Sequence, residues 1–164
     1  MFLSAFRGIP KGSFILHMNR LLGSFFATRD VETFKNLQES LGIIIGRSFA
    51  LQFFDRMVYV GSGLDLYLEV CNSSQLGVWL KNIGYAFVPK PHQQPTFLKS
   101  WSEALEETSG NISMLLTSWG FSYIFHFKNW TTNSSILLTT SVTCPLSQIL
   151  SSHSSATFIL LLHL

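Results

Sequence analysis

The chain has 164 residues, of which 47% are hydrophobic and 12% charged, and its 11 Lys and Arg against 9 Asp and Glu give a formal net charge of +2. High hydrophobicity with few charges excludes an intrinsically disordered chain and is enough for one domain with its own core. The small net charge, with basic residues scattered along the chain, excludes a phosphate-binding stripe and gives no clear nucleic-acid patch.

The two cysteines, Cys71 and Cys144, lack the spacing of a zinc site. We expect two free buried thiols in a reducing compartment. Charged residues and Pro10 interrupt the apolar N-terminal stretch, and the longest late apolar run, Phe158–Leu162, is too short to span a membrane. These features predict an intracellular, cytoplasmic protein with no membrane span.

The N-terminal part is expected to contain one helix. Residues 1–24 predict an irregular or loosely helical lead-in, so that a single domain covers residues 25–164. The segment 28–42 predicts the helix, with Asp30 as its cap and Gly42 as its stop. Its apolar residues recur at helical spacing and form one face: Val31, Phe34, Leu37 and Leu41.

The next segment predicts strand, helix and strand. Residues 42–46 are apolar enough for a short buried strand, and Ser48 is placed to cap a helix over 49–57. A loop then leads to a strand at Leu64–Val70, where polar residues alternate with leucines. Because successive side chains of a strand point to opposite faces, we expect one dry and one wet face. The residues expected on the wet face are Asp65, Tyr67 and Glu69.

The second half predicts further strands. A helix over 73–84, capped by Asn72 or Ser73, precedes a strand at 85–90, and the polar residues 91–113 predict an excursion. The remaining expected elements are strands at 121–127 and 135–141, a short helix opened by Pro145, and a strand or helix fragment at 157–164. The alternation of helices and strands predicts an α/β (α+β) fold with one mixed sheet flanked by helices.

One group of residues within this pattern predicts a site for an anion and a metal ion. A buried strand ends at Gly46–Ser48, a helix begins at once, and the next strand carries Asp65. Free backbone N–H groups at a helix start favour an anion, and a carboxylate on the adjoining strand favours Mg²⁺. The layout resembles the nucleotidyltransferase superfamily, which shares the polymerase beta fold, and "ALQFFDR", "LDLYLE" and "WLKNIGYAFVPKP" resemble a group of uncharacterised fungal proteins with this layout. The resemblance implies nucleotide contacts at Gly46 and Ser48, a metal ligand at Asp65, and an NTP with Mg²⁺ as ligand.

The chain departs from the superfamily pattern at three places. Arg47 stands where the motif has Gly, Gly63 stands at the first of two acid positions, and no Asp or Glu follows Glu107. Glu69 is a poor substitute for the missing acid, because four residues along a strand span about 13 Å. Asp65 is therefore expected to be a surface polar residue or the remnant of a metal site, and two-metal catalysis is not expected.

These observations lead to one functional hypothesis and two alternatives. We expect a nucleotidyltransferase-like domain without catalytic activity, a pseudoenzyme with a binding or protein-interaction role. The first alternative is an active Mg²⁺-dependent nucleotidyltransferase that uses an NTP. The second is a C-terminally truncated product without a defined activity, which the apolar ending and the lack of acids in residues 108–164 favour.

Overall fold

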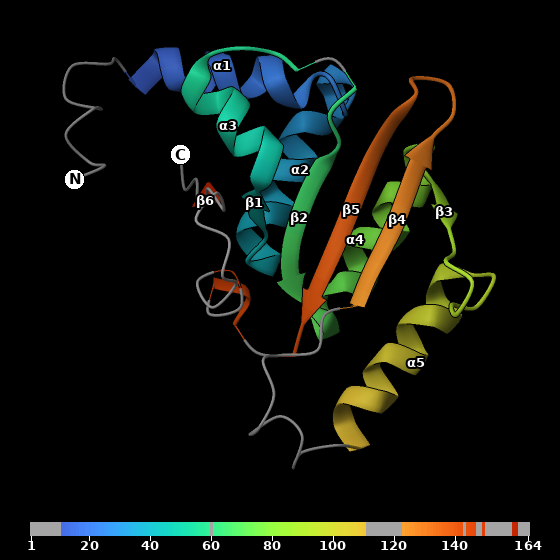
Figure 1. Ribbon diagram of the computed structural model, residues 1–164. Helices are drawn as coiled ribbons and strands as arrows, with labels where there is room; N and C mark the ends of the chain where they lie inside the picture. Colours follow the sequence, from blue (N-terminus) through green and yellow to red (C-terminus); the bar gives the residue numbers. More distant parts are fainter. Residues whose placement is uncertain are drawn as a thin grey trace.

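The computed structural model describes residues 11–59, 61–110, 123–142, 144–146, 149 and 159–160. Its helices are α1 (Lys11–Leu22), α2 (Thr28–Leu41), α3 (Arg47–Asp55), α4 (Val70–Asn82) and α5 (Phe97–Gly110). Its strands are β1 (Ile44–Gly46), β2 (Leu64–Glu69), β3 (Ala86–Val88), β4 (Tyr123–Asn129), β5 (Ser134–Ser141) and β6 (Ile159–Leu160). The described part of the chain is thus mixed α/β, as predicted (Figure 1).

The strands form one sheet in the order β3-β4-β5-β2-β1-β6. β2 runs parallel to β5, and every other neighbouring pair is antiparallel. Long β4 and β5 lie side by side next to β2 (Figure 1). β2 therefore occupies the interior of the sheet, with ladder hydrogen bonds on both sides. The tail was expected to form a strand or a helix fragment, and its described residues form the edge strand β6.

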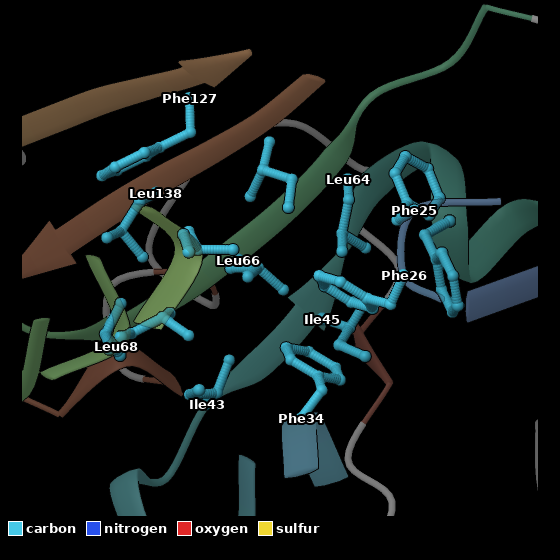
Figure 2. Packing of buried hydrophobic residues seen from close by; sticks show 14 of the residues in the cluster. Phe25, Phe26, Phe34, Ile43, Ile45, Leu64, Leu66, Leu68, Phe127 and Leu138 are labelled. Atoms are coloured by element: carbon cyan, nitrogen blue, oxygen red, sulfur yellow. The ribbon is translucent and has the colours of Figure 1, made fainter. Parts of the chain in front are cut away.

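One main core joins the sheet to the helices. Leu64, Leu66 and Leu68 of β2 are fully buried in it, and all five helices contribute side chains. Figure 2 shows these leucines together with Phe26 and Phe34, whose rings stack with centroids 4.6 Å apart. A second, smaller cluster contains Ile44, Tyr67 and Ile149, with Leu146 packed against it. Because side chains alternate along a strand, this second cluster lies on the opposite face of β2 from its leucines.

Residues 1–24 were expected to form an irregular or loosely helical lead-in, and their described part contains a regular helix that packs into the core. Helix α1 begins at Lys11 and buries Met18, Leu21 and Leu22 in the main core. The spacing of three and one residues places these side chains on one helix face, while Asn19 and Arg20 point to solvent. Arg20, one of the charges that interrupt the apolar run, thus lies on the outer face of an amphipathic helix whose inner face belongs to the main core.

The expected excursion over residues 91–113 contains a helix that the sequence pattern did not predict. Residues Phe97–Gly110 form helix α5. Its inner face carries Phe97 and Ala104, both buried, and the indole N–H of Trp101 donates to the Val70 carbonyl at 2.8 Å. The exposed acids of the outer face make the segment polar on average, which hides its helical period.

Helix α5 packs against α4 at an unusually close point. A methyl group added at buried Gly77 of α4 would come within 2.1 Å of the Phe97 ring. That ring is 1% exposed, and its centroid lies 5.1 Å from that of Phe127 and 5.3 Å from that of Phe125. The missing side chain at residue 77 therefore makes room for an aromatic ring in the core.

Helix ends were predicted better at the C-terminus than at the N-terminus. Gly42 ends α2 in a left-handed conformation (φ 66°), and its N–H donates to the Gln38 carbonyl. Asp30 does not cap this helix, because Ala27 is the N-cap residue and Asp30 lies within the first turn. Nor do Asn72 or Ser73 cap α4, whose N-cap is Glu69.

Candidate functional site

The residues singled out for a nucleotide site converge at the junction of β1, α3 and β2. Gly46 ends β1 with an extended backbone and is the N-cap residue of α3, without a side-chain cap bond. Gly46 is also the ladder partner of Asp65 in the antiparallel β1–β2 pair. Ser48 lies one residue inside α3, so its expected role as the helix cap is wrong. The structure therefore brings Gly46, Ser48 and Asp65 to one end of the β1–β2 ladder.

The hydroxyl of Ser48 serves a structural contact. Its Oγ donates to the carbonyl oxygen of Gly63 at 3.1 Å, which ties the first turn of α3 to the start of β2. This bond uses the single proton of the hydroxyl, the group that would donate to a phosphate oxygen. The local sequence thus joins its Gly-Ser turn to the following strand by a direct hydrogen bond.

Asp65 does not face solvent as expected. It is 8% exposed, and Tyr67 on the same face of β2 is 6% exposed. The prediction of a wet face failed because β2 lies inside the sheet and residues Leu146 and Ile149 from the C-terminal part cover the face around Tyr67. The alternating pattern predicted the position of the strand correctly, but the predicted solvent exposure of the Asp65 face was wrong.

The position of the first expected acid, Gly63, has little room for a side chain. A Cβ atom there would lie 3.1 Å from the Ser135 hydroxyl and 3.4 Å from the Ser135 carbonyl oxygen. Glu69, at the other end of β2, accepts a hydrogen bond from the thiol of Cys71 (3.6 Å). One buried carboxylate beside a crowded glycine does not fit a two-metal centre, which needs several oxygens around ions about 4 Å apart.

The loop before β2 is held by a residue that sequence reasoning missed. Gln52 of α3 is 3% exposed, and its side-chain amide donates to the Ser62 hydroxyl at 2.8 Å. Its side-chain carbonyl accepts the backbone N–H of Tyr59 at 2.7 Å. Asp55 at the end of α3 accepts a hydrogen bond from the Tyr59 hydroxyl at 2.6 Å. A glutamine inside a helix gives no sequence signal of such a role, because only the folded loop supplies its partners.

The two cysteines are free, as expected, but both are exposed and not buried. Partial desolvation of the sulfur, reinforced by the hydrogen bond to Glu69 and the charge of Glu69, raises the pKa of the Cys71 thiol. Cys71 is therefore protonated over a wider pH range than an ordinary cysteine, which makes it a slower nucleophile.

His126 on β4 lies between the buried rings of Phe125 and Phe127 in sequence and is half-buried on the other face of the strand. Burial lowers its pKa, and the positive charges of Lys128 and Lys90 lower it further.

Within the described ranges, no three His, Cys, Asp or Glu side chains come together as a metal site. The same ranges contain no helix long and apolar enough to cross a membrane.

Comparison with protein-family models, with curated proteins and with solved structures finds no match to this chain. Its function must therefore be argued from its own residues.

Proposed function

We propose that this chain is a nucleotidyltransferase-like domain that does not catalyse nucleotide transfer and acts by binding a partner. The observation that carries the proposal is the bond from the Ser48 hydroxyl to the Gly63 carbonyl, beside the buried Asp65. The hydroxyl that would contact phosphate in an active nucleotidyltransferase here joins α3 to the start of β2, and the carboxylate that would hold the metal is largely buried. A donor and a carboxylate committed to the fold are poor ligands for an incoming NTP.

The binding part of the proposal is supported by an exposed apolar segment at the end of α3. Phe54, Met57, Val58 and Tyr59 are 36–59% exposed, although all four are large hydrophobic residues. Isolated exposed apolar residues are common, but four within six positions form a local concentration. Such a surface favours a protein partner.

The alternative of an active Mg²⁺-dependent transferase has one observation in its favour. Gly46 and Asp65 are ladder partners, and Ser48 lies two residues beyond Gly46, so the motif residues do lie together. In that alternative a bound NTP would supply the remaining oxygens around one metal ion.

Calorimetric titration separates the two functions. The whole chain is titrated with each of the four NTPs, with and without Mg²⁺ or Mn²⁺, beside Asp65→Asn and the control Asp55→Asn, which changes an exposed acid of α3. We expect no metal-dependent heat from protein shown to be folded by circular dichroism. Metal-dependent binding that Asp65→Asn abolishes and Asp55→Asn retains would refute the loss of the site.

The binding role is tested with a photo-crosslinking residue placed at Val58, in cells that express the full chain. We expect one reproducible crosslinked species from this position and none from a matched probe at exposed Lys99 of α5. The same crosslinking pattern from both positions would contradict a specific surface at the end of α3.

A further inference from the structure

A pocket of about 390 Å³ lies between the end of α2, the end of β2 and the start of α4. This volume falls within the range of small-molecule sites, roughly 300–1,000 Å³. Asp65 and Glu69 are separated by four residues along β2, about 13 Å, so the pocket is distinct from the nucleotide site considered above. Its apolar wall consists of Leu41, Ile43, Ile44, Pro145 and Leu146.

Among the described residues that line the pocket, the charged side chains are both acidic, Glu39 and Glu69, and none is Lys, Arg or His. Glu39 lies in the last turn of α2, which has no basic residue. Because the C-terminal end of a helix carries partial negative charge, an acid there is unfavourable and a cation would be stabilised. Glu69 is the N-cap residue of α4, so the positive end of that helix balances part of its charge. The negative potential of the pocket is therefore strongest at Glu39 and the end of α2, where the nearest basic residue of the helix is Lys35, one turn earlier.

One polar side chain in the pocket wall lacks a partner. Gln38 is 8% exposed and lines the pocket, yet its side-chain amide makes no hydrogen bond to any residue that the structure describes. Its backbone carbonyl, by contrast, accepts the N–H groups of Gly42 and Ile43 and so fixes the end of α2. Because that amide has no protein partner among the described residues, a ligand that accepts or donates there gains a hydrogen bond without breaking one within the protein.

The neighbouring amide shows that the pocket wall is already ordered. Asn72 in the first turn of α4 donates to the Leu41 carbonyl at 3.3 Å and so bridges α4 to the end of α2. Its side-chain oxygen is contacted by the Cys71 thiol at 3.7 Å. A preformed wall reduces the entropy lost when a ligand binds.

We propose that this pocket binds a small organic ammonium ion with an apolar tail. The ammonium group would lie between the Glu39 carboxylate, the carbonyl end of α2 and the amide oxygen of Gln38, all of which accept hydrogen bonds from N–H. The tail would pack on the apolar wall beside Pro145 and Leu146. The proposal does not depend on whether the nucleotide site is active.

The probe is 2-phenylethylamine, titrated calorimetrically into the whole chain, with 2-phenylethanol as the uncharged isostere and ethylammonium as the cation without an aromatic tail. We expect binding of the amine and at least about tenfold weaker binding of either control. Added salt should weaken the amine alone, because screening acts on the charge.

The variants are Glu39→Gln and Gln38→Leu, each expected to weaken the amine about tenfold. The matched control is Glu32→Gln, which removes an exposed acid two turns earlier on α2 and outside the pocket, and should leave binding unchanged. Equal binding of amine and alcohol, or no effect of Glu39→Gln in a folded protein, would overturn the proposal.

A second readout needs no change to the proposed ligand contacts. Cys144 lines the pocket and is a free exposed thiol. In Cys71→Ser protein, 2-phenylethylamine should slow alkylation of Cys144, while 2-phenylethanol at the same concentration should not. Unchanged alkylation at saturating amine would place the amine outside the pocket and so refute the assignment.

Discussion

Replacement of Gly77 by alanine tests the close contact between α4 and α5. In a free helix the change stabilises by about 0.8–1.0 kcal/mol, because alanine is a far better helix former than glycine. Here the added methyl would lie 2.1 Å from the Phe97 ring, well inside the contact distance of two carbon atoms. The ring cannot move aside easily, since it is 1% exposed and packed against other rings.

The two effects can be compared in magnitude. Overpacking of a filled core destabilises by about 1–3 kcal/mol, which exceeds the gain in helix propensity. An approach of 2.1 Å places this change in the upper part of the overpacking range, about 2–3 kcal/mol. After the helix gain of about 1 kcal/mol is subtracted, we expect Gly77→Ala to destabilise the domain by about 1–2 kcal/mol, equivalent to a fall in Tm of about 2–8 °C for a chain of this size. The sign is opposite to that expected from the helix alone, which makes the measurement decisive.

The assay is urea unfolding followed by circular dichroism, on Gly77→Ala and on the same change in a Phe97→Leu background. With the ring removed, the Gly77→Ala step should become neutral or stabilising, a coupling of about 1–3 kcal/mol. Gly12→Ala in α1 is the control, because a methyl group there meets nothing within 4 Å and should not destabilise. A Gly77→Ala protein as stable as the parent would refute the proposed ring–backbone packing.

Two predictions concern protonation. Glu69→Gln should speed alkylation of Cys71 by iodoacetamide near pH 8, because loss of the carboxylate charge lowers the thiol pKa. The rates of the two proteins in urea should be equal, and equal rates in the native state would contradict the contact. His126 should titrate by NMR below its ordinary pKa, and Lys128→Gln should raise that pKa. Because the pKa of His126 is lower in the folded state than in the unfolded state, unfolding takes up a proton as the pH falls. The contribution of His126 to stability is therefore present above pH about 6.5 and is lost as the pH falls through the folded-state pKa. An unshifted His126 titration would show that burial and the lysine charges do not act on it.

The fold could be predicted from sequence where one period dominated. The 3.6-residue period of Val31, Phe34 and Leu41 located α2, and Gly42 correctly marked its end. The alternation around Leu66 located β2. In each case the spacing of neighbouring residues was enough to predict the type of element, because the prediction did not depend on contacts with distant segments.

The errors have a common physical cause, which is that accessibility depends on distant partners. The pattern around Asp65 is the same for an interior and an edge strand, and only pairing with β5 and β1 shows that β2 is interior. In α5, exposed acids outweighed the inward Phe97 and Ala104 in average polarity. The proximity of Gly46, Ser48 and Asp65 follows from strand–helix–strand connectivity. The roles of Gln52 and Gln38 could not be predicted, because their surroundings are formed only in the folded structure.

The pairing of β6 with β1 has a consequence for biosynthesis. Ile45 finds its ladder partner Leu160 only after more than a hundred further residues have been added. At typical rates of 5–20 residues per second, that is a delay on the order of ten seconds. Throughout this time the outer edge of β1, in the apolar run Ile43–Ile45, lacks its partner strand while the chain is still attached to the ribosome. An unpaired apolar edge can pair with other chains, so the domain is expected to need chaperone protection most during its own synthesis.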